Sequence, residues 1–418
     1  MKRKLCRQTA NEWQHNVWLA LELLIVSVVM WFISDYLYTN ISIVTSPRGF
    51  DTEHCYLIKY AELNDKSPDY VSGLSDEQRN DNLLRLIDLL QKRPEIECVA
   101  MGQNSYFYNG SNSGIQLEKD SLTTGEGYFL HRLVSADFPR VFRIHGANGE
   151  SPEDLAEILK NGPRRSFIIS DNAFARHGID HMKEFIGSDF YSSSHNDTLK
   201  LLTSFVPARY NDYTPEEHSG SAMMCIPPTN YIYLNEMMVR VRDNMDRGFI
   251  ENLMKDASKT LRSGNHYISG VQSFDDIRTI HQRDSDADLR NYLIGAAFLA
   301  LNIFLGLFGT FWFRTQQRVP EIAIRKANGA TRGDIFRRIV SEGELILLAV
   351  TPVAILIDWQ LTKMELNTYY HGGYFEPLRF FCCVAVAWVL MALMILLGTV
   401  IPANRAMKIA PAEALNEE

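Results

Sequence analysis

The sequence predicts an α-helical integral membrane protein with four transmembrane helices and a large mixed α+β extracytoplasmic domain between helices 1 and 2. Apolar segments long enough to cross a bilayer, about 20 residues, occur near the N-terminus and in the last third of the chain. A long polar stretch of soluble-like composition separates them, and a short basic loop lies between two of the later segments. The 46% hydrophobic content and the net charge of -8 over 418 residues are therefore averages over two environments.

The first transmembrane segment is expected at Val17–Ile33, after a basic N-terminal stretch. A cleaved signal peptide would give a similar pattern, but no small-residue cleavage site follows the segment. Aromatic residues suited to the membrane interface follow it instead, so we interpret it as a retained signal anchor. Glu22 lies within it. A carboxylate there is a functional candidate, unless it lies close enough to the cytoplasmic edge to reach the lipid headgroups.

Residues 40–288 contain no segment that could cross a membrane and are expected to fold as a separate domain with its own core. Apolar periodicity and capping signals predict its helices, and short apolar runs rich in β-formers predict its strands. The predicted helices are Leu83–Leu90, one starting at Ser151, Asp171–His177 and Asp246–Leu261. The predicted strands are Glu97–Gly102, Ser105–Tyr108, Ser166–Ser170, Tyr231–Leu234 and Met237–Val241.

This domain carries no pattern typical of an enzyme, and we expect no catalytic residue, cofactor or metal. His177 and His181 have the spacing of two metal ligands on a helix, but Gly178 lies between them and no third ligand is placed. Cys55, Cys98 and Cys225 cannot all pair, so the domain contains one disulfide or free buried thiols. No basic face interleaved with aromatic residues indicates nucleic acid as a partner.

Three further transmembrane segments are expected at Leu293–Phe313, Ile339–Ile357 and Phe380–Ile401. The charged run Asp275–Arg290 should extend the first of these three helices beyond the bilayer. The same helix carries glycines and alanines, with Asn302 near its middle. Small residues let helices approach closely, and asparagine can form a hydrogen bond across a helix pair. This face is either a dimer contact or packs within one subunit.

The loop between the second and third segments, residues 314–338, holds seven basic residues and two acidic ones. A short basic loop between two spans should face the cytoplasm, because lysine and arginine near span ends resist translocation. Pro320 can begin a short helix, Gly329 can end it in a left-handed conformation, and Thr331 or Asp334 can cap the next helix.

This loop resembles the hallmark of the MacB-like and FtsX-like ABC transporter permeases, E-I-G-I-R-K-A-(apolar)-G-A-[ST]-x-x-D-I followed by a glutamate eight residues later. The matching positions are Glu321, Ile322, Ile324, Arg325, Lys326, Ala327, Gly329, Ala330, Thr331, Asp334, Ile335 and Glu342. Asn328 departs from the family's usual apolar residue. The resemblance implies a coupling helix that docks on an ATPase subunit. Glu321, Arg325 and Lys326 would orient that partner. Ile322 and Ile324 would anchor it.

Other stretches resemble the same family in the right order. Asp137–Ile144 is similar to its D-F-x-x-V-F-x-I element, and Pro402–Leu415 is similar to its C-terminal P-A-x-R-A-A-x-x-x-P-x-E-A-L signature. The resemblance therefore covers most of the chain. It implies an N-terminal segment with transmembrane helix 1 (1–39), a MacB-like extracytoplasmic domain (40–288) and an FtsX-like permease domain (289–418) with coupling loop 314–338, external loop 358–379 and cytoplasmic tail 402–418.

The chain has no G-x-x-x-x-G-K-[ST] phosphate-binding loop, so a separate ABC ATPase subunit is expected to hydrolyse ATP. The resemblance implies a non-catalytic, multi-pass permease of the bacterial inner membrane with both termini in the cytoplasm. It would form a homodimer or a heterodimer with a related permease. Membrane lipid and a periplasmic or outer-membrane protein are further expected partners.

Such a permease would transmit ATP-driven force to the extracytoplasmic domain, for efflux of a peptide, antibiotic or lipid. Two alternatives stay open at this point. One is an FtsX-type signalling permease that activates a cell-wall hydrolase. The other is a non-ABC membrane sensor whose outer domain binds a ligand.

Overall fold

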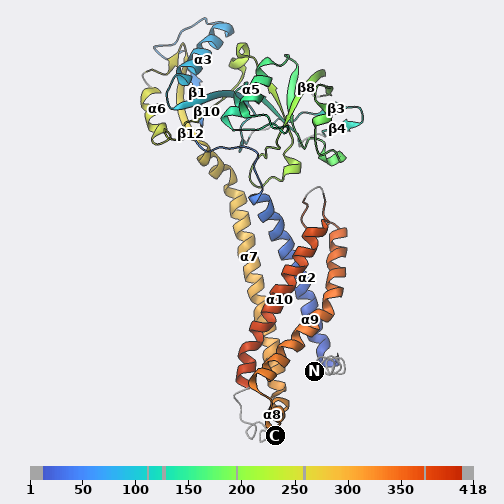
Figure 1. Ribbon diagram of the computed structural model, residues 1–418. Coiled ribbons are helices and arrows are strands. Elements are labelled where there is room, and N and C mark those ends of the chain that lie inside the picture. The colour runs from blue at the N-terminus through green and yellow to red at the C-terminus, as the bar shows by residue number, and fades with distance from the viewer. Residues whose placement is uncertain are drawn as a thin grey trace. The chain divides into compact units, whose positions relative to one another are not determined.

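The computed structural model describes residues 13–110, 113–124, 129–193, 196–257, 260–370 and 373–406. The chain divides into two compact units (Figure 1). The helical unit comprises the segments up to Ser42 and from Ala287 onward, and the mixed unit comprises residues 43–286. The N-terminal basic stretch and most of the Pro402–Leu415 signature lie outside the described residues.

Four long helices dominate the helical unit, and each is long and apolar enough to cross a membrane. They are α2 (Trp13–Thr45), α7 (Phe274–Gln317), α9 (Arg332–Lys363) and α10 (Pro377–Ala406). The four predicted spans are confirmed, and every helix extends beyond the predicted apolar segment. The charged run Asp275–Arg290 is helical and continuous with the second span, because α7 begins at Phe274.

One apolar core holds these four helices together. Fully buried members include Leu23 of α2, Leu307 of α7, Leu347 of α9 and Ile395 of α10. Helix α7 contributes least, because only 6% of its most apolar window is buried inside the chain. The other side of α7 is therefore available to lipid or to another protein.

A buried ion pair joins α2 to the beginning of α10. Arg379 Nε lies 2.9 Å from Asp35 Oδ1, and the two side chains are 1% and 2% exposed. The same guanidinium donates from Nη2 to the carbonyl oxygens of Thr368 and Tyr374, at 2.9 and 2.8 Å. Opposite charges and backbone acceptors thus compensate for the removal of both groups from water, and they fix the connection between α9 and α10.

Described residues of the mixed unit form a twelve-stranded sheet in the order β11-β12-β1-β10-β2-β5-β9-β6-β8-β7-β3-β4. The β5–β9 and β6–β8 pairs are parallel, and the other pairs are antiparallel. The strands are β1 (Cys55–Glu62), β2 (Ile96–Gln103), β3 (Leu117–Lys119), β4 (Leu122–Thr123), β5 (Leu130–Val134), β6 (Ser166–Ser170), β7 (Asp189–Ser192), β8 (Asp197–Phe205), β9 (Ser221–Cys225), β10 (Glu236–Val241), β11 (Arg262–Ser263) and β12 (His266–Ser273).

Helices cover both faces of this sheet. The α-helices are α3 (Asp76–Gln91), α4 (Phe138–Val141), α5 (Pro152–Asn161) and α6 (Phe249–Ala257). The short 3-10 turns are η1 (Ala175–His177), η2 (Lys183–Phe185), η3 (Glu216–His218) and η4 (Pro228–Tyr233). Successive side chains of β2 point to opposite faces. Cys98 and Ala100 accordingly join the core with α4 and α5, while Val99 and Met101 join the core with α3 and α6.

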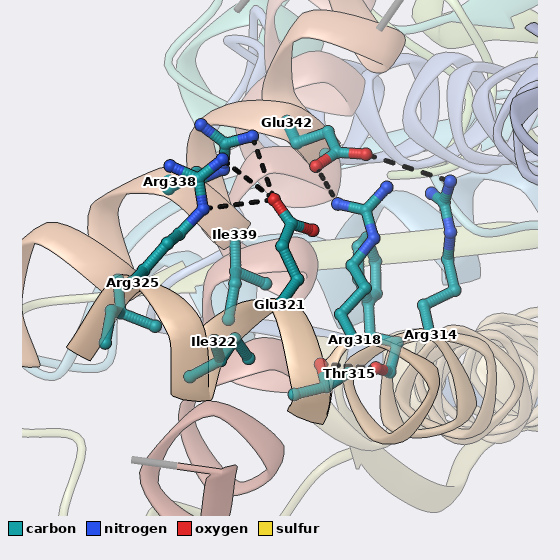
Figure 2. A pocket seen from close by; sticks show the side chains of 12 residues that line it. Arg314, Thr315, Arg318, Glu321, Ile322, Arg325, Arg338, Ile339 and Glu342 are labelled. Atoms are coloured by element: carbon teal, nitrogen blue, oxygen red, sulfur yellow. Dashed lines mark hydrogen bonds and ion pairs between the residues drawn. The ribbon is translucent and has the colours of Figure 1, made fainter. Parts of the chain in front are cut away.

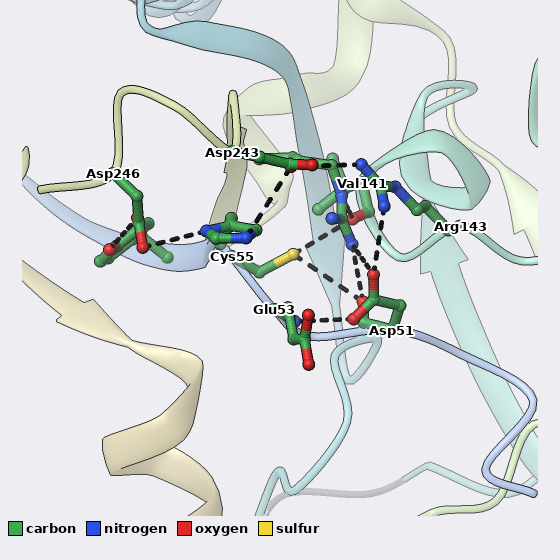
Figure 3. Close-up of polar contacts among 10 residues, drawn as sticks. Asp51, Glu53, Cys55, Val141, Arg143, Asp243 and Asp246 are labelled. Atoms are coloured by element: carbon green, nitrogen blue, oxygen red, sulfur yellow. Dashed lines mark hydrogen bonds and ion pairs between the residues drawn. The ribbon is translucent and has the colours of Figure 1, made fainter.

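A polar network anchors the segment that enters the mixed unit (Figure 3). The fully buried Arg240 donates to the carbonyl oxygens of Val141 and Asp51, at 2.6 and 2.9 Å, and its Nη2 lies 3.3 Å from Asp51 Oδ2. Arg143 Nη1 lies 3.6 Å from the same carboxylate. Asp51 is thereby held against β10 and the chain after α4.

Most predicted elements of the mixed unit are confirmed. Three are wrong. Ser105–Tyr108 is a turn, in which Tyr108 has a φ of 62° that a strand does not allow. Tyr231–Leu234 belongs mostly to η4, which follows Pro227. Asp171–His177 is a turn followed by η1, because the Asp171 carboxylate accepts from Met182 N and binds the chain back on itself. The thiols of Cys55, Cys98 and Cys225 are free.

Candidate functional site

Helix α8 (Val319–Ala327) is the short helix between α7 and α9, and its ends follow from local sequence. Pro320 lies in the first turn, where its missing N–H costs no intrahelical bond. Gly329 has a φ of 88°, which terminates the helix in the left-handed region. Thr331 caps α9 in a reciprocal box with Asp334, with Asp334 N donating to Thr331 Oγ1 at 3.2 Å. The predicted helix, stop and cap are confirmed.

Glu321 connects α8 to itself and to α9 (Figure 2). Its Oε1 accepts from Arg325 Nε and Nη2 at 3.0 and 2.8 Å, and from Arg338 Nη2 at 3.4 Å. The side chains of Glu321 and Arg325 are 37% and 39% exposed, so both also reach solvent. Two groups predicted to face a partner thus already pair with each other.

Glu342 makes a second connection, from α9 to the end of α7 (Figure 2). The carboxylate is 9% exposed, accepts a short hydrogen bond from Arg318 Nη1, and lies 3.9 Å from Arg314 Nη2. These groups line a cavity of about 40 Å³ with Glu321 and Arg338. Two arginines around one buried carboxylate keep its charge compensated.

Apolar residues of α8 divide between the inside and the surface. Ile322 is 6% exposed and packs with Ile335 and Ala403. Ile324 is 51% exposed. The expectation that both isoleucines anchor a partner therefore needs correction, because Ile322 anchors α8 to its own chain. Ala330 packs at the edge of the same small core.

The surface that α8 presents consists of Ile324, Ala327, Asn328 and Gly329, which we call the α8 outer face. All four are exposed. Asn328 Nδ2 donates to Ile324 O at 2.9 Å, so the family-atypical residue caps the helix end. Half-buried Arg325 and Lys326 border this face. The arrangement offers an apolar contact with a basic rim.

The predicted intramembrane polar residues have separate surroundings. Glu22 of α2 accepts a hydrogen bond at 2.9 Å from Thr310 Oγ1 of α7, so it links two helices. Asn302 donates to Phe298 O of its own helix at 2.7 Å and is exposed. Glu342 lies in the cluster around α8. The three residues therefore do not form one site.

The two histidines with metal-like spacing point to different acceptors. His177 Nε2 lies 2.9 Å from Thr123 O, and His181 Nδ1 lies 2.7 Å from Asp171 Oδ2. The Asp171 carboxylate raises the pKa of His181 by hydrogen bonding and by its charge. No group of three or more potential metal-ligating side chains occurs in the part of the chain that the structure describes.

Sequence reasoning missed Arg314, Arg318 and Arg338 as members of the site. Arg314 lies in the last turn of α7 and Arg318 directly follows that helix, and a separation of four residues favours the same side of the chain there. That spacing beside a span was a usable signal that both could meet one acid. The family motif did not point to these arginines, because they lie outside the matched positions.

Comparison with known proteins gives a family match over the region just described. Residues 293–411 match the model of the FtsX-like permease C-terminal family. The macrolide export ATP-binding/permease protein MacB of Shewanella sp. (strain W3-18-1) is 25% identical over 191 residues. That alignment covers 44% of this chain and 28% of the relative, so the chain aligns with under a third of that protein's length.

Among solved structures, the periplasmic region of MacB from Actinobacillus actinomycetemcomitans matches with a TM-score of 0.32 at 10% identity. The match covers 57% of this chain and 97% of that one. The family match and the curated relative agree with the motif around α8. Residues 293–411 thus carry an FtsX-like permease C-terminal domain, and the chain is similar to MacB/FtsX-like ABC transporter permeases, as its sequence predicted.

Proposed function

We propose that the chain is the membrane permease of an ABC transporter and that the α8 outer face docks on an ABC ATPase. The observation that carries the proposal is the combination at α8 of an exposed isoleucine, a basic rim and attachment to both neighbouring helices. Apolar anchors surrounded by charges are typical of docking surfaces, because the apolar contact supplies affinity and the charges supply orientation.

Force applied to α8 would reach the long helices through three contacts. Glu321 with Arg338, and the packing of Ile322 on Ile335, join α8 to α9. Arg318, which directly precedes α8, binds Glu342 of α9. Because α7 is one uninterrupted helix from Phe274 to Gln317, a shift at its cytoplasmic end would be carried toward the mixed unit. We call this transfer mechanotransmission.

The orientation of the chain in the membrane follows from the distribution of its basic residues. Residues 314–338 are strongly basic and lie between two spans, which favours a cytoplasmic location. With four spans, both termini would then be cytoplasmic and the mixed unit would lie outside the inner membrane. The sparsely buried side of α7 would meet lipid or a second permease copy.

Export is the transport direction that the comparisons favour. The Shewanella relative is named for macrolide export, and we propose efflux of a peptide, antibiotic or lipid for this chain. Neither activation of a cell-wall hydrolase nor a purely sensory role gains support from the comparisons.

Replacing Arg325 by glutamate tests the proposal. The change reverses the basic rim and places two carboxylates side by side, so binding of the ATPase should be lost while membrane insertion persists. The tagged permease is purified from detergent-solubilised membranes, and mass spectrometry identifies co-purified proteins that carry a phosphate-binding loop.

The matched control is Arg337→Glu, which makes the same charge change at an exposed position in the second turn of α9. The Arg337→Glu variant should still co-purify with the ATPase. Equal recovery of the ATPase with the Arg325 variant and the wild type would contradict docking at α8.

A further inference from the structure

A small cavity lies between α2, α9 and α10, remote in sequence from the α8 cluster. Its volume is about 20 Å³. Polar side chains from all three helices line it: Ser27 and Trp31 of α2, Thr351 and Asp358 of α9, and Trp388 of α10. The remaining lining is aliphatic. It contacts none of the residues that we assign to docking.

Two of these side chains are buried with unused hydrogen-bonding atoms. Trp31 is 1% exposed and Asp358 is 2% exposed. Within the described parts of the chain, neither Trp31 Nε1 nor Asp358 Oδ1 has a hydrogen-bond partner. Leaving a buried donor or acceptor unpaired is unfavourable, and more so for a charged group. A ligand that satisfies both atoms would remove that cost.

The charged side chains near Asp358 interact with other groups and do not serve as its counter-ion. Asp35, one turn along α2 from Trp31, is paired with Arg379 of α10, which also binds two carbonyl oxygens. Lys363 of α9 lies with its Nζ 3.7 Å from the ring centre of Trp359. On α10, the titratable residues Cys382 and Cys383 directly precede the lining residue Val384 in the sequence. No ion pair to Asp358 forms among the described residues.

The chemistry of the cavity selects its ligand. An indole N–H requires an acceptor, and a carboxyl oxygen requires a donor, so the ligand must do both. A bare metal ion would be repelled by the N–H and would find few oxygen ligands. A cavity needs about 10–15 Å³ to hold one water molecule, and this one, at about 20 Å³, is large enough for one.

We propose that Asp358 and Trp31 form a proton-binding site that holds one water molecule. A hydronium ion transfers a proton to the Asp358 carboxylate and remains as neutral water. That water accepts from Trp31 Nε1–H and donates to Asp358 Oδ1 and to Ser27 or Thr351, while the added proton lies on the other carboxyl oxygen, Oδ2. A neutral carboxyl with a partner is compatible with a buried position, whereas an isolated carboxylate is not. The site is independent of docking at α8.

Infrared spectroscopy of the full-length protein in lipid nanodiscs tests the proposal. The wild type should show a protonated-carboxyl C=O band that disappears in Asp358→Asn. The control Glu365→Gln removes an exposed acid just beyond α9 and should keep the band. In Trp31→Phe the band should shift to higher frequency, because the bridged water loses its indole donor.

Water itself is detected by exchange into H₂¹⁸O, which should shift a bound-water O–H band in the wild type and in Glu365→Gln but not in Trp31→Phe. This comparison decides the matter even if the Asp358 variant does not fold. A carboxyl band that survives Asp358→Asn, or an ¹⁸O-sensitive band that Trp31→Phe leaves unchanged, would overturn the site.

Discussion

Charged side chains around α8 are largely paired within the chain, which limits what a partner can recognise there. Glu321 binds Arg325 and Arg338, and Glu342 binds Arg318. The partly exposed ion pairs of Glu321 contribute about 0–1 kcal/mol each, so they can rearrange toward a partner at small cost. Ile324 has no such internal role. We therefore expect it to supply much of the docking energy.

Replacing Ile324 by serine should weaken ATPase binding without changing the fold. Burying the exposed part of this side chain is worth about 1–2 kcal/mol, so Kd should rise about 5- to 30-fold. Surface plasmon resonance with immobilised permease measures this Kd for the ATPase. Ile322→Ser is the contrasting variant, because loss of a buried isoleucine should destabilise the α8 region by about 3 kcal/mol. An unchanged Kd for the Ile324 variant would exclude the α8 outer face from the interface.

Asp212 in the mixed unit should make stability depend on acid pH. Burial alone would raise its pKa, but the nearby Gln282 amide and the hydrogen bonds from Tyr108 and Arg278 lower the pKa overall. Tyr108 Oη donates at 2.9 Å and Arg278 Nε at 2.8 Å. A lowered pKa means that the unfolded state binds more protons, so stability rises with pH.

The stabilisation by Asp212 should therefore be complete above the unfolded-state pKa of about 3.9 and disappear as pH falls through the lower folded value. Asp212→Asn should cost about 2 kcal/mol near neutral pH, as expected for hydrogen bonds to a charged group. Urea pulse proteolysis that follows fragments of residues 43–286 measures the pH dependence of stability and the stability lost in Asp212→Asn. Equal stability of variant and wild type at pH 7 would contradict this role.

Sequence patterns identified the residues of the family motif at α8 but not the side chains they bind. The spacing of Glu321 and Arg325 showed a shared helix face, yet it did not reveal that Arg338 completes the cluster. Likewise, nothing in a run of apolar letters distinguishes Ile322, which faces Ile335, from exposed Ile324. Such partners depend on how α8 lies against α9, which is a tertiary property.

The stop at Gly329 determines how α8 leads into α9. Its φ of 88° is a backbone conformation that is strained for any residue with a Cβ. There is nevertheless room for a Cβ, because no atom lies within 4 Å of the position that it would occupy. A substitution there consequently tests backbone conformation without a steric clash.

Gly329→Ala should destabilise the α8–α9 turn by about 1 kcal/mol, because alanine resists the left-handed region. Hydrogen exchange of the α8 amides should then increase several-fold. The control is Gly333→Ala, which lies inside α9, where an added Cβ would meet Thr331 Oγ1 at an ordinary contact distance of 3.9 Å, and it should stabilise slightly. Identical exchange in the two variants would mean that the turn does not require a left-handed residue.

Elements with strong local signals were predictable, and elements with context-dependent backbones were not. Ser151–Pro152 and Thr331 with Asp334 begin helices because their capping bonds are local. Ser105–Tyr108 has strand-like residues, but Ser105 donates to the Glu236 carboxylate at 2.9 Å through its backbone N–H, which bends the chain into a turn. That partner is 131 residues away.

At the scale of the whole molecule, two units share the long helices α2 and α7. Apolar runs predicted both helices, since a bilayer requires that length. The sheet order could not be read from the sequence, because β1 pairs with β10 and β12 across most of the mixed unit. Docking of an ATPase requires that α8 lies on the cytoplasmic side of the membrane.

Labelling of Asn328→Cys tests this orientation most directly. The exposed cysteine is introduced into an otherwise cysteine-free chain, and Thr229→Cys in the mixed unit serves as the external control. A membrane-impermeant maleimide should label Asn328→Cys in inside-out vesicles only, and Thr229→Cys in cells with a permeabilised outer envelope only. Labelling of Asn328→Cys from the outer side would contradict an ATPase-driven permease.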